Sequence, residues 1–95
     1  MANETYYLVK PTSSFKKDLK RVDRQGRDID LLSKILGKLA NKEPLEESNH
    51  DHGLSGKYKG CRECHIQPDW LLIYQVDNET LYLYLMRTSS HAELF

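Results

Sequence analysis

The chain has 95 residues, of which 39% are hydrophobic and 29% charged, and its formal net charge is zero. This length predicts one domain over residues 1–95, because a domain commonly takes ~100–200 residues. The composition excludes a disordered chain, and the charge balance excludes a uniformly basic nucleic-acid coat or a uniformly acidic mimic. The apolar run 70–74 is far shorter than the ~20 residues of a membrane span, and the start of the chain is too polar for a secretory signal. We therefore expect a cytoplasmic protein that makes no membrane contact.

The first predicted element is a strand over residues 6–10, an aromatic and β-branched stretch that ends at Pro11. Residues 12–14 are each suitable helix N-caps, and a helix is predicted after them, ending near Gly26. Its apolar side chains recur at helical spacing, at Phe15, Leu19 and Val22.

A second helix is predicted over residues 29–41, capped by Asp28 or Asp30 and ended by Pro44. Its leucines and isoleucines form a wide apolar stripe. Because only a few residues separate the two helices, they should form an antiparallel hairpin whose apolar stripes need a sheet or each other.

The second half of the chain is typical of a sheet. It contains a polar loop (43–53), a loosely alternating strand (58–66), a turn (67–69), a strong strand (70–76), a hairpin turn (77–79), a second strong strand (80–87), a segment that leaves the sheet (88–90) and a short tail (91–95). The order β-α-α-β-β-β predicts an α+β fold, in which an antiparallel meander is covered on one face by the helical hairpin. The pattern does not predict which strand the first one pairs with.

Three histidines, His52, His65 and His91, lie beside turns or strand ends, and Asp69 lies in the turn after His65. A meander brings such edges together, and imidazole with carboxylate can perform general acid–base catalysis because histidine titrates near neutral pH. The alternative is that these are incidental surface residues.

Strand parity places one of these histidines. On a regular strand over 61–66, Cys61, Glu63 and His65 share a face, and the residues between them share the other. Because Ile66 should face the helices, we expect His65 to point away from them into an open groove.

The segment 61–65 matches the haem-attachment pattern C-x-x-C-H. We reject haem attachment because the pattern lies on a predicted strand and the small core leaves no haem pocket. A zinc site with His50 or His52 is also disfavoured, because Cys61 and Cys64 should point to opposite faces of a strand. We therefore predict two ordinary reduced cysteines, Cys64 buried and Cys61 near the groove, and no cofactor.

Other side chains could contact nucleic acid. Trp70 is either a core anchor or a stacking platform for a base, and Phe95 either docks onto the sheet or contacts a substrate. Basic residues concentrate in 10–38 and again at Lys57, Lys59 and Arg62, which permits a local phosphate-binding face despite the zero net charge. For the helix residues 16–24 alone, a solvated helix face is the commoner explanation.

Four segments together resemble the YafQ branch of the RelE/ParE toxin superfamily. They are Phe15-Lys16-Lys17-Asp18 with the helical hairpin, the run 51–60, the block H-I-Q-P-D-W-L-L-I-Y (65–74) and the tail R-T-S-S-H-A-E-L-F (87–95). The last two are specific in combination, and the resemblance covers nearly the whole chain.

The resemblance implies a metal-independent endoribonuclease that cuts translated mRNA in the ribosomal A site. The implied catalytic set is His52, His65, Asp69 and His91. Arg87 would stabilise phosphate charge, while Trp70 and Phe95 would position the nucleotide or support the site.

The implied partners are the 70S ribosome with its mRNA and a cognate antitoxin, a DinJ/RelB-like ribbon-helix-helix dimer whose C-terminal tail wraps the toxin. DNA would be bound only through the toxin–antitoxin complex. A gyrase poison like the related ParE branch is disfavoured, because such proteins are expected to lack these histidines.

One departure favours a second interpretation. The family tail often reads R-T-G-T-H, whereas this chain has Ser89-Ser90 in place of Gly-Thr. If the glycine supplies a positive φ, serine should be strained there and should re-aim His91. With the low net charge, this motivates the alternative of a catalytically weak binding module that acts with its antitoxin as a DNA-binding autorepressor.

Overall fold

The computed structural model describes residues 6–95. The strands are β1 (Leu8–Pro11), β2 (His52–Gly53), β3 (Arg62–Gln67), β4 (Trp70–Asp77) and β5 (Tyr82–Ser89). The helices are α1 (Ser13–Arg24), α2 (Ile29–Ala40) and α3 (His91–Leu94), with two short 3₁₀ helices, η1 (Glu47–Asn49) and η2 (Gly56–Tyr58). Among the described residues, no helix has the length and apolar character needed to cross a membrane.

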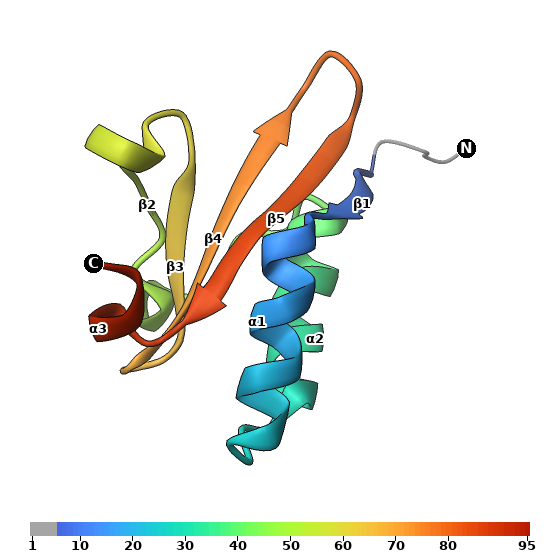
Figure 1. Cartoon of the computed structure of the whole chain (residues 1–95). Coiled ribbons are helices and arrows are strands. Elements are labelled where there is room, and N and C mark those ends of the chain that lie inside the picture. The colour runs from blue at the N-terminus through green and yellow to red at the C-terminus, as the bar shows by residue number, and fades with distance from the viewer. Residues whose placement is uncertain (1–5) are drawn as a thin grey trace.

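The five strands form one sheet in the order β1-β5-β4-β3-β2. The predicted antiparallel meander of β3, β4 and β5 is confirmed, and β2 adds a short antiparallel edge. The partner of β1, which the sequence pattern left open, is β5, and the two run parallel. As Figure 1 shows, α1 and α2 run beside each other on one side of the sheet, and α3 lies near the end of β3.

The predicted helix ends are confirmed by their caps. Thr12 Oγ1 accepts a hydrogen bond from Phe15 N at 3.1 Å, and Asp28 Oδ1 accepts one from Asp30 N at 3.0 Å. Gly26 lies just after α1 with φ +83°, a conformation that glycine adopts without the clash that a Cβ causes. Local sequence chemistry therefore sets the length and the turn of the helical hairpin.

The side chains of β4 alternate between two apolar clusters, and this defines two faces of the sheet. Trp70, Leu72 and Tyr74 pack with α1 and α2, on what we call the helix face. Leu71 and Ile73 pack with Cys61 and Leu94 on the opposite face, which we call the α3 face. All five residues from Trp70 to Tyr74 are at most 2% exposed, so β4 is the central buried strand.

The structure corrects the ends of several strands. β1 covers Leu8–Pro11 rather than 6–10, and β5 begins at Tyr82 rather than at residue 80. The strand predicted over 58–66 begins only at Arg62, because residues 56–58 form η2. Thr88 and Ser89, predicted to leave the sheet, instead belong to β5 and pair with Leu72 and Leu71. Small polar residues suggested a turn there, but both side chains are fully buried and hydrogen-bonded.

Two glycine-to-alanine substitutions should change stability in opposite directions. Gly26→Ala places a Cβ at φ +83° and should lower the free energy of unfolding by ~1–2 kcal/mol. Gly37→Ala lies within α2 with open space for the Cβ, and it should raise the free energy by ~0.5–1 kcal/mol. Urea unfolding of both variants checks this, and equal changes would contradict the assignment of Gly26 as the end of α1.

Candidate active site

Two of the predicted histidines meet at a buried carboxylate. His52 lies opposite Glu63 in the pairing of β2 with β3, and its Nε2 is 3.3 Å from Glu63 Oε1. The Nε2 of His65 is 3.8 Å from the same oxygen. The Glu63 side chain is only 6% exposed, whereas half of the His52 side chain is exposed. A carboxylate thus lies between two imidazoles at the edge of the sheet.

Backbone carbonyls determine which nitrogen of each ring carries a proton. His52 Nδ1 is 2.7 Å from the carbonyl oxygen of His50, and His65 Nδ1 is 3.2 Å from that of Pro68. A carbonyl can only accept, so each Nδ1 must be the donor. The Nε2 of each ring then faces Glu63 and is the nitrogen that can gain or lose a proton. This is the arrangement that acid–base chemistry needs.

The strand register places these residues in one row with Arg87. His52 pairs with Glu63, Glu63 with Ile73, and Ile73 with Arg87. Directly opposed residues share a face, and Ile73 packs with Leu94 on the α3 face. His65 lies opposite Leu71, another residue of that face, so the predicted orientation of His65 away from α1 and α2 is confirmed.

His91 lies at the start of α3 over the same face. Leu94 is buried against Cys61, Leu71 and Ile73 and anchors this short helix to the sheet. The His91 ring stacks on Phe95 with centroids 4.8 Å apart, and Phe95 makes an edge contact with Tyr58 at 5.8 Å. Phe95 is 56% exposed, so its ring remains available to a ligand.

Arg87 and Lys57 line a small cleft of about 270 Å³ with Tyr58. The Lys57 ammonium lies 5.5 Å from the Tyr58 ring centroid. The Arg87 Nε and Nη2 atoms both bond to Asp18, at 2.6 and 3.1 Å. Hydrogen bonding to the Asp18 carboxylate, against the effect of burial, raises the pKa of Arg87 above its ordinary value. Two cationic side chains therefore border one cleft.

The expectation that Trp70 contacts a nucleotide is wrong, and its alternative as a core anchor is correct. Its side chain is fully buried on the helix face, where Nε1 donates to Thr88 Oγ1 at 2.9 Å. Arg27 covers the ring from outside, with the guanidinium carbon 5.5 Å from the centroid. A base cannot stack on a ring with no exposed surface, but the Thr88 bond does hold Trp70 next to the strand position of Arg87.

The remaining predicted residues have other partners or are exposed. Asp69 is largely exposed and pairs with Arg27, both bonds measuring 3.4 Å. That hydrogen bonding lowers the pKa of Asp69 below its ordinary value, so the carboxylate is ionised at neutral pH and cannot donate a proton. Arg62 alternates to the opposite side of β3 from His65 and pairs with Asp51 at 3.3 Å. Lys59 follows η2 and is exposed.

The replacement of Gly-Thr by Ser89-Ser90 introduces no backbone strain. Ser89 belongs to β5, and Ser90 has φ −75° and ψ 159°, a normal extended conformation. Ser90 Oγ accepts a hydrogen bond from Glu93 N and caps α3. The expected re-aiming of His91 by strain is therefore wrong, because neither position has a positive φ.

The two cysteines lie in different clusters, Cys64 on the helix face and Cys61 on the α3 face. Both are free thiols and both are buried. Burial was predicted for Cys64, whereas Cys61 was expected near the groove. Burial, with a smaller contribution from nearby carboxylates, raises the pKa of Cys64 to about 12. Within residues 6–95, no three His, Cys, Asp or Glu side chains are arranged to hold a metal ion.

Sequence reasoning missed the acidic partners of the predicted site. Glu63 shares the parity of His65, and this spacing was the one available signal for it. Asp18 lies on α1 and reaches Arg87 across 69 positions of sequence, which no local pattern predicts. His50 is brought to the site by the fold, and its ring centroid lies 5.5 Å from that of His65.

Three similarities place the chain among known proteins. The mRNA interferase toxin YafQ of Escherichia coli strain K12 is 35% identical over 85 residues, which span 88% of this chain and 90% of that protein. A metal-bound toxin from Helicobacter pylori superposes with a TM-score of 0.88 at 43% identity, over 94% of this chain and 99% of that one. The toxin in the E. coli DinJ–YafQ toxin–antitoxin complex does so with a TM-score of 0.85 at 33% identity, over 95% and 98%.

A family profile leads to the same assignment. It describes YafQ, a bacterial toxin of type II toxin–antitoxin systems, and it matches residues 7–95, nearly the whole chain. The predicted resemblance and the α+β fold are thereby confirmed. The chain belongs to the YafQ family of bacterial toxins of type II toxin–antitoxin systems.

Proposed function

We propose that this toxin is an endoribonuclease that cuts translated mRNA in the ribosomal A site without a metal ion. The observation that carries the proposal is the paired imidazoles of His52 and His65, each with Nδ1 held by a carbonyl and Nε2 directed at Glu63. The relative from E. coli that is named an mRNA interferase toxin supports the same activity. A toxin that acts on translating ribosomes would be a cytoplasmic protein.

The proposed reaction is an in-line attack of a ribose 2′-hydroxyl on the adjacent phosphate. One group of the set His52, His65, Asp69 and His91 takes the 2′ proton, and another gives a proton to the departing 5′ oxygen. A 2′-O–P bond forms and the P–O5′ bond breaks, leaving a 2′,3′-cyclic phosphate and a 5′-hydroxyl. The ionised state of Asp69 suits acceptance of a proton or hydrogen bond rather than donation.

Arg87 and Lys57 would stabilise the negative charge that grows on the phosphate. They border one cleft next to Tyr58, on the edge of the α3 face. Preorganised cations act most strongly where charge develops in the transition state. We propose that Phe95, stacked on His91, packs against a base. The ribosome would supply the alignment of the mRNA, which can contribute as much as the catalytic groups themselves.

We propose a cognate antitoxin as the resting partner, as in the E. coli DinJ–YafQ complex. The antitoxin would be a ribbon-helix-helix dimer whose tail folds over the toxin on binding, a coupled folding event. DNA contact would then come through the antitoxin. The strain expected at Ser89 had favoured a catalytically weak binding module, and without that strain the module rests only on the low net charge.

Mapping of cut sites in a reconstituted translation system tests this function. The purified toxin should cut within the reading frame of a translated mRNA and leave the same mRNA intact when its start codon is removed. Absence of cuts on ribosomes, together with tight binding of an antitoxin–operator complex, would instead establish the binding module. Equal cutting of translated and untranslated RNA would contradict the dependence on the ribosome.

A further inference from the structure

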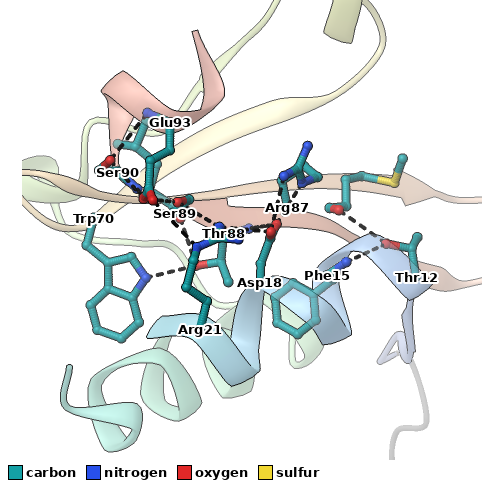
Figure 2. Close-up of polar contacts among 12 residues, drawn as sticks. Thr12, Phe15, Asp18, Arg21, Trp70, Arg87, Thr88, Ser89, Ser90 and Glu93 are labelled. Carbon is teal, nitrogen blue, oxygen red and sulfur yellow. Dashed lines mark hydrogen bonds and ion pairs between the residues drawn. The ribbon is translucent and has the colours of Figure 1, made fainter. Parts of the chain in front are cut away.

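A buried aspartate on α1 holds four hydrogen-bond donors where α1 meets β5. The Asp18 side chain is only 2% exposed. It accepts from Arg87 Nε at 2.6 Å, Arg87 Nη2 at 3.1 Å, the backbone N of Thr88 at 3.1 Å and Arg21 Nη2 at 3.0 Å. Figure 2 shows the carboxylate pointing from α1 to β5, where the Arg87 guanidinium meets it.

The Asp18 carboxylate lies at the edge of β5, past the point where β1 stops pairing with it. The pairing of β1 with β5 ends at Leu85, so beyond that residue β1 no longer lines this edge of β5. Thr12 at the start of α1 continues the contact, since its N and Oγ1 donate to the carbonyl of Leu85. Asp18, which lies later on α1, then accepts a hydrogen bond from the N–H of Thr88. The helix thus replaces a neighbouring strand at the position of Arg87.

The bidentate pair fixes the Arg87 guanidinium in one plane. Two of its three nitrogens are held by Asp18, and the side chain lines the cleft with Lys57 and Tyr58. An arginine that is already oriented loses less conformational freedom when it binds a phosphate. Hydrogen bonds from Arg87, Thr88 and Arg21 outweigh the effect of burial and keep the pKa of Asp18 below its ordinary value, so the carboxylate stays ionised at neutral pH.

The same network extends to α3. Arg21 also donates to Ser89 Oγ at 3.0 Å and lies 3.6 Å from Glu93. Glu93 accepts hydrogen bonds from Ser89 Oγ and from Ser90 N and Oγ, which fixes the first turn of α3 (Figure 2). His91 is the first residue of that helix. A chain of contacts therefore joins the base of Arg87 to the start of the segment that carries His91.

We propose that Asp18 is a positioning residue, which orients Arg87 toward the RNA phosphate and, through Arg21 and Glu93, holds His91 at the matching position. This inference rests on the proposed RNA cleavage and on the roles of Arg87 and His91 in it. Asp18 itself lies behind Arg87 and does not touch RNA. Its effect should therefore appear in the rate of the chemical step rather than in the binding of ribosomes.

The test is the cleavage kinetics of Asp18→Asn on translating ribosomes. Asparagine keeps the volume but removes the charge and one acceptor, so kcat should fall by about 10²-fold while KM for ribosomes stays nearly unchanged. Asp23→Asn is the matched control, because it makes the same chemical change at an exposed position of α1, and it should cut at the unaltered rate. Asp18→Glu, which keeps both oxygens, should recover part of the loss.

A double-mutant cycle separates positioning from folding. In an Arg87→Ala background, Asp18→Asn should cause a much smaller further loss than in the unaltered toxin, because only its effect on His91 through Arg21 and Glu93 remains. A purely structural role would lower activity equally in both backgrounds and would overturn the proposal. Cleavage by folded Asp18→Asn at the unaltered rate would also overturn it. If the unaltered toxin fails to cut mRNA on ribosomes, the proposed function itself fails, and that result is distinct from the other two.

Discussion

Replacing His65 with glutamine should lower the rate of mRNA cleavage by about 10²–10⁴-fold, the usual contribution of a general acid or base. Glutamine can still donate a hydrogen bond to the carbonyl of Pro68, but it cannot transfer a proton at the position of Nε2. The loss should appear in the cleavage rate on ribosomes saturated with toxin, since the substitution changes proton transfer more than binding. Growth arrest by the expressed toxin should be lost in parallel.

Stability measurements show whether the lost activity of His65→Gln comes from lost proton transfer or from unfolding. His65 is partly exposed at the edge of the sheet, so the free energy of unfolding of His65→Gln should differ from that of the unaltered protein by no more than about 0.5 kcal/mol. His65→Ala, which also removes the bond to Pro68, should be equally inactive. Full activity of the folded glutamine variant would contradict a proton-transfer role for His65.

Trp70→Ala should destabilise the protein by about 3–5 kcal/mol, which is a large part of the ~5–15 kcal/mol that holds a small domain together. The ring is fully buried between α1, α2 and the sheet, and its loss leaves a cavity in the larger core cluster. Trp70→Phe should cost less, about 1–2 kcal/mol, because the volume is mostly kept and only the bond to Thr88 is lost. Chemical denaturation measures both values.

Phe95→Ala is the matched control for the tryptophan, because it removes an aromatic ring that is 56% exposed. Its contacts with His91 and Tyr58 should contribute at most about 1 kcal/mol to stability. We expect Phe95→Ala to stay folded and to lose cleavage activity, and Trp70→Ala to lose the fold itself. If Trp70→Ala were stable and had lost only its activity, Trp70 would have a role in the active site rather than in the core.

Local patterns were sufficient to predict most of the fold. The helix caps, the glycine after α1 and the turns at both ends of β4 are contained within a few residues of sequence. The structure selects Thr12 and Asp28 among the candidate caps and confirms the glycine and both turns, although the second turn continues to Leu81. The parallel pairing of β1 with β5 is different, because it joins residues more than 70 positions apart. The strand position of residues 88–89 also depends on distant residues. Small hydroxyl side chains are typical of a turn, and they can lie in a buried strand here because Leu71 and Arg21 form hydrogen bonds with them.

The candidate site was predicted only in part, for the same physical reason. Strand parity alone oriented His65, and the resemblance added Arg87, but neither shows that His52, Glu63, Ile73 and Arg87 form one row across four strands. That row depends on the register of three separate pairings. Trp70 was ambiguous because an aromatic ring that begins an apolar strand suits a core and a base equally well. Only burial decides between these roles.

A single 2′-deoxy substitution in a translated mRNA shows whether the 2′-hydroxyl is the attacking nucleophile. If imidazoles on the α3 face direct a 2′-hydroxyl attack, removing that hydroxyl at the cleaved linkage should abolish the cut there. The unsubstituted mRNA should give a 2′,3′-cyclic phosphate and a 5′-hydroxyl. Undiminished cutting at the deoxy position, with 5′-phosphate ends, would show that the toxin does not use the 2′-hydroxyl.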